Sequence, residues 1–163
     1  MGFFSRIFGT DKIANVKEGQ SRLPADAGGM SEMGLDARTA AAILAEIDID
    51  TAIAAHENWK VRLQNYLDGK STENLQPEVI CLDDRCDLGK WLHGPGGQRL
   101  GKYPAFTMLV ARHKYFHVQA STVLALAQGG NPQKATQTLE SSYRHASSQV
   151  VLLLKELKRG LGR

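Results

Sequence analysis

The chain has 163 residues, 42% of them hydrophobic, which is enough for one domain with a buried core. Its 20 basic residues nearly balance 17 acidic ones, and no stripe of basic residues interleaved with aromatics indicates nucleic-acid binding. Two cysteines do not form a disulfide framework, and no apolar run approaches the roughly 18–20 residues that cross a bilayer, so we expect a reducing cytoplasm.

Residues 1–34 predict a flexible leader, because glycines and a proline are scattered among polar residues without a sustained period. Its first residues place Phe3, Phe4, Ile7 and Phe8 on one side of a short amphipathic patch. Such a patch would dock on a partner or make weak contact with a membrane surface. The favoured interpretation is a disordered start that carries a few apolar side chains.

Residues 35–163 predict a helical domain with three long amphipathic segments. Apolar residues spaced three and four apart run through 36–67, then through 104–128, and finally through about 133–158. A Gly-Gly-Asn-Pro sequence at 129–132 separates the last two segments. No part of the sequence alternates as a strand would.

The stretch between the first two long helices is less regular. Periodicity leaves residues 72–85 open, either as a single helical turn or as an extended crossing. A brief helix from about residue 84 to residue 93 follows, and the Gly-Pro-Gly-Gly run at 94–97 is expected to stop it. The sequence therefore predicts an all-α fold, an antiparallel four-helix-type bundle in which one short helix carries Cys86.

Three histidines and one cysteine are candidate metal ligands. His113 and His117 are four residues apart, so they project from one helix face and can bind one cation together. His56 lies on or beside the apolar stripe of the first helix. Cys86 opens the short helix, where the positive end of the helix dipole favours its thiolate. Such a set suits Zn(II), although two histidines at this spacing also serve iron, nickel and copper sites, and a single inward histidine is more often a core residue.

Residues near the candidate ligands have expected supporting roles. Trp59 and Trp91 each follow a candidate ligand closely, so they would wall the site and exclude water. Gly89 lacks a side chain one turn after Cys86, which would let a neighbouring helix or imidazole approach. One of the nearby aspartates, Asp83, Asp84 or Asp87, is a candidate acceptor for a ligand imidazole, with helix capping by Asp83 or Asp84 as the alternative.

The other cysteine and histidines have simpler expected roles. Cys81 is interpreted as a small buried apolar residue rather than as a ligand or a resolving thiol. His93 stands beside a Gly-Pro-Gly-Gly turn and should be exposed to solvent. His145 lies near the polar side of the last helix and is assigned no role.

The order of these residues resembles the chemoreceptor zinc-binding (CZB) family of bacteria. The matching sequences are His56-x-x-Trp59, Cys86-x-Leu88-Gly89-x-Trp91 and His113-x-x-x-His117, and the resemblance covers about residues 47–157. It implies that His56, Cys86, His113 and His117 bind zinc in a homodimeric helical bundle. It also implies that zinc or oxidant signals pass to a chemotaxis or cyclic-di-GMP signalling partner. The sequence shows no methyl-accepting helix and no GGDEF motif, so the resemblance does not identify this partner.

Three functions are compatible with this pattern. A regulatory zinc-binding module, not an enzyme, is favoured because four protein ligands leave no position for a catalytic water. A zinc hydrolase would need a labile Cys86 and a general base, and Glu57 points about 100° away from His56 around the helix. A hemerythrin-like di-iron bundle would need more inward histidines and bridging carboxylates.

Overall fold

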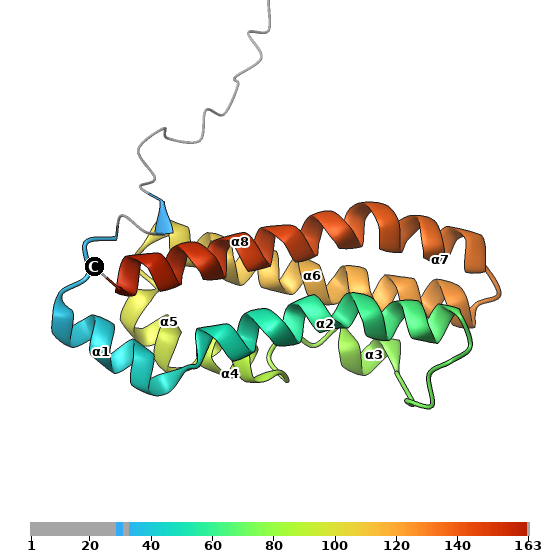
Figure 1. Ribbon diagram of the computed structural model, residues 1–163, viewed down its shortest axis with the longest axis horizontal. Coiled ribbons are helices and arrows are strands. Elements are labelled where there is room, and N and C mark those ends of the chain that lie inside the picture. The colour runs from blue at the N-terminus through green and yellow to red at the C-terminus, as the bar shows by residue number, and fades with distance from the viewer. Residues whose placement is uncertain (1–28, 31–32, 163) are drawn as a thin grey trace, which may run out of the picture.

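The computed structural model describes residues 29–30 and 33–162, and these residues form a bundle of helices. Three long rods dominate it in Figure 1: α2, α6, and a continuous rod made of α7, the π-helical turn η2 and α8. Their bounds are Ile49–Leu67 for α2, Pro104–Gln128 for α6, Pro132–Thr138 for α7, Leu139–Tyr143 for η2 and Arg144–Leu161 for α8. The all-α prediction is confirmed.

The fourth member of the bundle is a broken return rather than a rod. It consists of α3 (Pro77–Ile80), α4 (Asp87–His93) and α5 (Pro95–Leu100), which lead the chain back along the bundle before α6 begins. Rod, return, rod and rod therefore alternate in direction (Figure 1). This is the predicted antiparallel four-helix-type bundle, with the predicted short helix, α4, beginning directly after Cys86.

The first long segment differs from the prediction of one helix over 36–67. It forms α1 (Ala37–Glu46) and α2, with Ile47 in an extended conformation between them. Asp48 causes the restart, because its side chain accepts a hydrogen bond from the backbone N–H of Thr51 at 3.0 Å and so caps α2. An aspartate in the middle of a periodic stretch was thus an N-cap signal.

The Gly-Pro-Gly-Gly run also differs from its prediction as a stop. Only Gly94 interrupts the helix, and Pro95 then begins α5, where its missing N–H is no loss. Gly96 lies against the indole of Trp91, since an added Cβ would stand 2.7 Å from that ring. Residues 72–85, left open by the sequence, contain the single turn α3.

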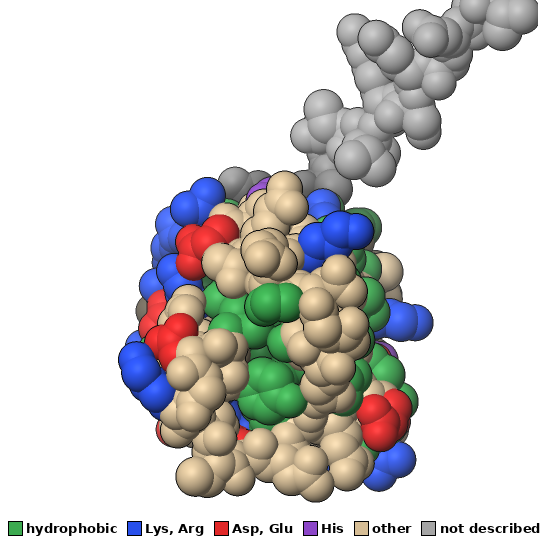
Figure 2. Space-filling model, turned by 90° about the vertical axis from the view of Figure 1, so that its right-hand side faces the viewer, with side chains coloured by type: hydrophobic (Ala, Val, Ile, Leu, Met, Phe, Trp, Pro, Cys, Tyr) green, Lys and Arg blue, Asp and Glu red, His purple; other side chains and the backbone are tan. Residues whose placement is uncertain are grey.

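The inward rows of the long helices form the core as the spacing predicts. On α6 the buried residues include Phe106, Leu109, Phe116 and Ala120, and on the last rod they include Tyr143. On α2 the predicted row is buried at its two isoleucines, at His56 and at Leu63. Figure 2 shows the end of the bundle where α2 finishes and α7 begins, with hydrophobic side chains at its centre and charged ones towards its edge.

The predicted leader, residues 1–34, lies largely outside the described residues, and so does its apolar patch at Phe3, Phe4, Ile7 and Phe8. Of its last residues, Met30 is described, and its side chain is buried in the core. In the described part of the chain, no helix combines the length and the apolar character needed to span a membrane.

Candidate metal centre

Four side chains from three parts of the fold converge inside the bundle. They are His56 on α2, Cys86 at the start of α4, and His113 and His117 on α6, and one nitrogen or sulfur atom from each lies within 4.8 Å of all the others. The three histidines are buried and Cys86 is half-buried. The structure therefore brings together all four residues that the sequence selected.

Backbone carbonyls orient two of the imidazoles. Nδ1 of His56 lies 2.6 Å from the carbonyl oxygen of Ala52, and Nδ1 of His117 lies 2.8 Å from that of Ile80. A carbonyl oxygen only accepts, so each Nδ1 must carry the ring proton. Each Nε2 is then an unprotonated nitrogen with a free lone pair, which is the form that binds a metal.

His113 is placed with its Nε2 towards the same centre. This atom lies 3.3 Å from Sγ of Cys86. Its other nitrogen, Nδ1, is buried and has no hydrogen-bond partner, and Oδ2 of Asp83 is 3.8 Å away. Nε2 of His117 is likewise buried without a partner. Buried nitrogens without partners are costly, and a shared cation would satisfy those that face the centre.

The turn before α4 fixes Cys86. Its Sγ accepts the backbone N–H of Gly89 at 3.2 Å, so the sulfur itself caps the helix. Gly89 is needed because a Cβ there would stand 1.7 Å from the carbonyl oxygen of Asp83. The close approach expected at Gly89 therefore comes from the loop backbone, where the sequence had suggested a helix or an imidazole.

Burial has the largest effect on the electrostatics of these four side chains. Burial raises the pKa of the Cys86 thiol, more than the N–H groups of Gly89 and Leu88 lower it. The free thiol is thus protonated at neutral pH, which differs from the expectation that the helix end favours thiolate. Burial also lowers the pKa of all three imidazoles, that of His113 to about 2 with help from its histidine neighbours, so all are neutral.

Comparison with known protein families agrees with this geometry. Residues 56–124 match the family described as the chemoreceptor zinc-binding domain, CZB. This segment belongs to the CZB family. It begins at His56 and contains the other three residues of the cluster. No match was found among curated proteins or among solved structures.

The CZB segment fits a metal ion in its donor atoms as well as in its geometry. Three imidazole nitrogens and one thiol sulfur are donors that Zn(II) accepts, and the cluster holds no carboxylate of the kind that bridges di-iron centres. CZB is a regulatory zinc-binding family, which agrees with a closed set of four protein donors.

Phe116 packs against the histidines of the CZB segment. Its ring centroid is 5.0 Å from that of His56 and 5.4 Å from that of His117. The two tryptophans expected as walls make other contacts: Trp59 stacks under the guanidinium of Arg62, and Trp91 packs against the ring of Phe106. The sequence could have indicated this contact, because Phe116 directly precedes His117 on the inward face of its helix.

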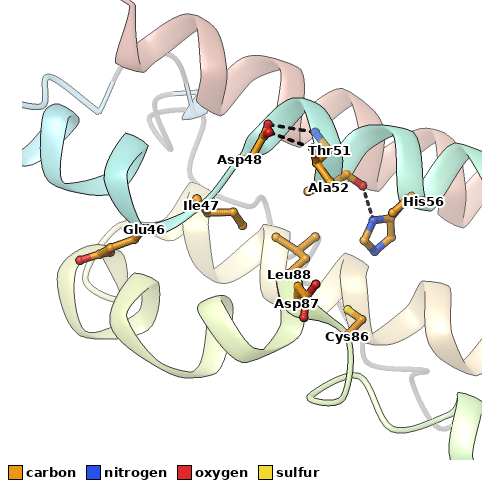
Figure 3. Close-up of a pocket in the computed structure, with 10 residues that line it drawn as sticks. Glu46, Ile47, Asp48, Thr51, Ala52, His56, Cys86, Asp87 and Leu88 are labelled. Atoms are coloured by element: carbon orange, nitrogen blue, oxygen red, sulfur yellow. Dashed lines mark hydrogen bonds between the residues drawn. The ribbon is translucent and has the colours of Figure 1, made fainter.

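A pocket of about 390 Å³ reaches the cluster from the side of α2 and α4 (Figure 3). His56 and Cys86 form one end of it, and Ile47 and Leu88 line its middle. Acidic side chains of Glu46, Asp48 and Asp87 also line it. Cys86 therefore borders a space large enough for a small solute.

The remaining candidates have no place in the cluster. His93 and His145 are exposed, as expected for His93. Cys81 is half-buried, and its thiol donates to the carbonyl oxygen of Glu78 at 3.3 Å. The sequence missed the two backbone carbonyls that orient His56 and His117, because no residue type marks a carbonyl acceptor.

Proposed function

We propose that the chain is a zinc-binding regulatory module. One Zn(II) is held by Nε2 of His56, His113 and His117 and by Sγ of Cys86. The observation that carries this proposal is the convergence of these donors within 4.8 Å, with two Nδ1 atoms already committed to carbonyls. Zinc bound there would join α2, α4 and α6, so its presence would control how these elements pack.

Metal analysis of variants tests the proposal. The wild type should hold one zinc per chain, and replacing both His113 and His117 by alanine should abolish binding, because two of four ligands are lost. His145→Ala is the matched control, since this exposed histidine lies outside the cluster. Full zinc occupancy in the double variant would refute the ligand assignment.

We propose that the signal is the loss of zinc or the oxidation of Cys86. Hypochlorous acid would take two electrons from the thiolate, giving sulfenic acid and chloride, and the oxidised sulfur is a weaker ligand. The half-buried Cys86 lines a pocket, which supports access by a small oxidant. Released zinc, followed with a chromogenic chelator and restored by thiol reductant, is the expected result. Zinc retained until the protein unfolds would mean that the ion is only structural.

A hydrolase remains the alternative with an observation behind it, since the pocket beside His56 and Cys86 has room for water and a substrate. The regulatory proposal predicts that the zinc-loaded wild type hydrolyses activated esters no faster than the double variant in which His113 and His117 are replaced by alanine and no zinc is bound. A colourless protein that contains zinc would also exclude a di-iron centre.

A regulatory module with a reduced thiolate would act in the cytoplasm on a signalling partner. Pull-downs with and without a zinc chelator can identify this partner.

We further propose a homodimer that uses the outer face of α6. Met108, Tyr115 and Val118 are exposed on this helix, and the exposed Ala111 and Ala125 lie on the same row, three residues after Met108 and seven residues after Val118. A helix that is apolar on both faces is typical of a buried position, and this spacing is that of a helix-pairing seam. Light scattering should give twice 17.8 kDa. Val118→Glu should give monomers, whereas Val61→Glu on α2, also exposed, should not.

A further inference from the structure

Nδ1 of His113 lacks the hydrogen-bond partner that Nδ1 has in the other two imidazoles. His56 and His117 donate from Nδ1 to backbone carbonyls, but Nδ1 of His113 is buried and without a hydrogen bond. If Nε2 of His113 binds a metal, the proton has to sit on Nδ1. A buried N–H without an acceptor is unfavourable, so an occupied site needs an acceptor at this atom.

Asp83 is placed to be that acceptor. Its Oδ2 lies 3.8 Å from Nδ1 of His113, so a movement of less than 1 Å would bring the two atoms within hydrogen-bond distance. The same oxygen lies 2.8 Å from Nε2 of His93, which holds the carboxylate from the solvent side. The backbone of Asp83 is fixed by its close approach to Gly89.

The charge of the site also favours a carboxylate there. A divalent cation with one thiolate and three neutral imidazoles carries a net positive charge, inside a protein where unbalanced charge is costly. Asp83 has a side chain only 15% exposed, so water screens its charge weakly. One ionised carboxylate would make the centre neutral overall.

We propose that Asp83 is the positioning residue of the metal centre: its carboxylate accepts the Nδ1–H of His113 when the metal occupies Nε2, and His93 anchors that carboxylate. This inference rests on the proposed zinc site. The loop between α3 and α4 thereby has two roles in zinc binding: Asp83 orients His113, and Cys86 at the end of the loop is a ligand.

Zinc affinity of matched variants tests the inference, measured by competition with a chromogenic chelator. Asp83→Ala should weaken binding about 10- to 100-fold, as is usual for an outer partner of a ligand histidine, and the isosteric Asp83→Asn should weaken it about 10-fold. His93→Ala should weaken it about two- to tenfold, the value of one hydrogen bond. Asp84→Asn is the control, because this exposed aspartate pairs only with Arg85 in the structure. Affinities of both Asp83 variants within about twofold of the control would overturn the inference.

A second readout separates positioning from general destabilisation. In the zinc-loaded wild type, nitrogen-15 NMR should show His113 protonated at Nδ1, with a hydrogen-bonded proton protected from exchange. In Asp83→Asn this proton should shift upfield and exchange faster, while the Nδ1 protons of His56 and His117 stay as they are. An unchanged His113 signal would overturn the positioning role even if affinity falls.

The proposed function and this inference fail in different ways. A wild type that binds no zinc would refute the proposed function itself. A wild type that binds zinc, with Asp83 variants of unchanged zinc affinity, would refute only this inference.

Discussion

The helix α6 and the broken return from α3 to α5 build the same site in different ways. α6 is an uninterrupted helix of 25 residues, and its regular spacing alone sets His113 and His117 side by side. The return has no regular period, and it contributes Cys86, the carbonyl of Ile80 and the carboxylate of Asp83 through turns and close backbone contacts. The rigid rod thus fixes two ligands, and the irregular segment completes the site around them.

Because of this difference, an added methyl group should destabilise the protein more in the return than at the end of a helix. Gly89→Ala would place a Cβ 1.7 Å from the carbonyl oxygen of Asp83, so the loop must move. We expect a loss of about 3 kcal/mol in the free energy of unfolding, together with weaker zinc binding. Urea unfolding of the metal-free protein measures the first effect.

Gly162→Ala is the control for this substitution, because a Cβ there would meet its nearest neighbour at 3.7 Å. It should unfold at the same urea concentration as the wild type. If Gly89→Ala also does so, the contact between Gly89 and Asp83 does not fix the turn.

The ligands on the two regions should also respond differently to pH. Burial keeps the imidazoles of α2 and α6 neutral by lowering their pKa values, whereas it raises the pKa of the Cys86 thiol, so zinc must displace the thiol proton. Zinc affinity should therefore rise about tenfold per pH unit between about pH 6 and pH 8, with about one proton released per zinc. Calorimetry in buffers of different ionisation enthalpy counts these protons.

The Cys86→Ser variant provides the comparison for the pH dependence. Its weaker zinc binding should release almost no proton over the same range, because the imidazoles are already neutral there. Release of two or three protons by the wild type would instead mean that the histidines are charged in the metal-free protein.

The smallest expected effect is at the second cysteine of the return. Cys81 lies outside the cluster and donates its thiol hydrogen to the carbonyl oxygen of Glu78. Cys81→Ser can keep this hydrogen bond, so zinc affinity should change by less than about twofold and oxidant-driven zinc release should be unaltered. A reductant-insensitive loss of zinc after oxidation of this variant alone would show that Cys81 acts as a resolving thiol.

The regular parts of the fold were predictable from sequence, and the irregular parts only partly so. The period of α6 predicted its bounds and its inward residues, because helix geometry converts spacing directly into direction. The break at Asp48 was missed because a single side-chain cap overrode a helical pattern that continues on both sides. Spacing also placed the three histidines on inward faces, whereas Cys86 was selected because it opens a short helix, and the resemblance to the CZB family joined all four in one site. The carbonyls of Ala52 and Ile80 could not be predicted, because they depend on where the backbone lies in the fold.

X-ray absorption at the zinc edge identifies the atoms that bind the ion. For the zinc-loaded wild type, we predict three nitrogen neighbours at about 2.0–2.1 Å and one sulfur at about 2.3 Å. The sulfur shell should disappear in Cys86→Ser. A first shell without sulfur in the wild type, or a shell of six light atoms, would contradict the assignment of His56, Cys86, His113 and His117 as the ligands.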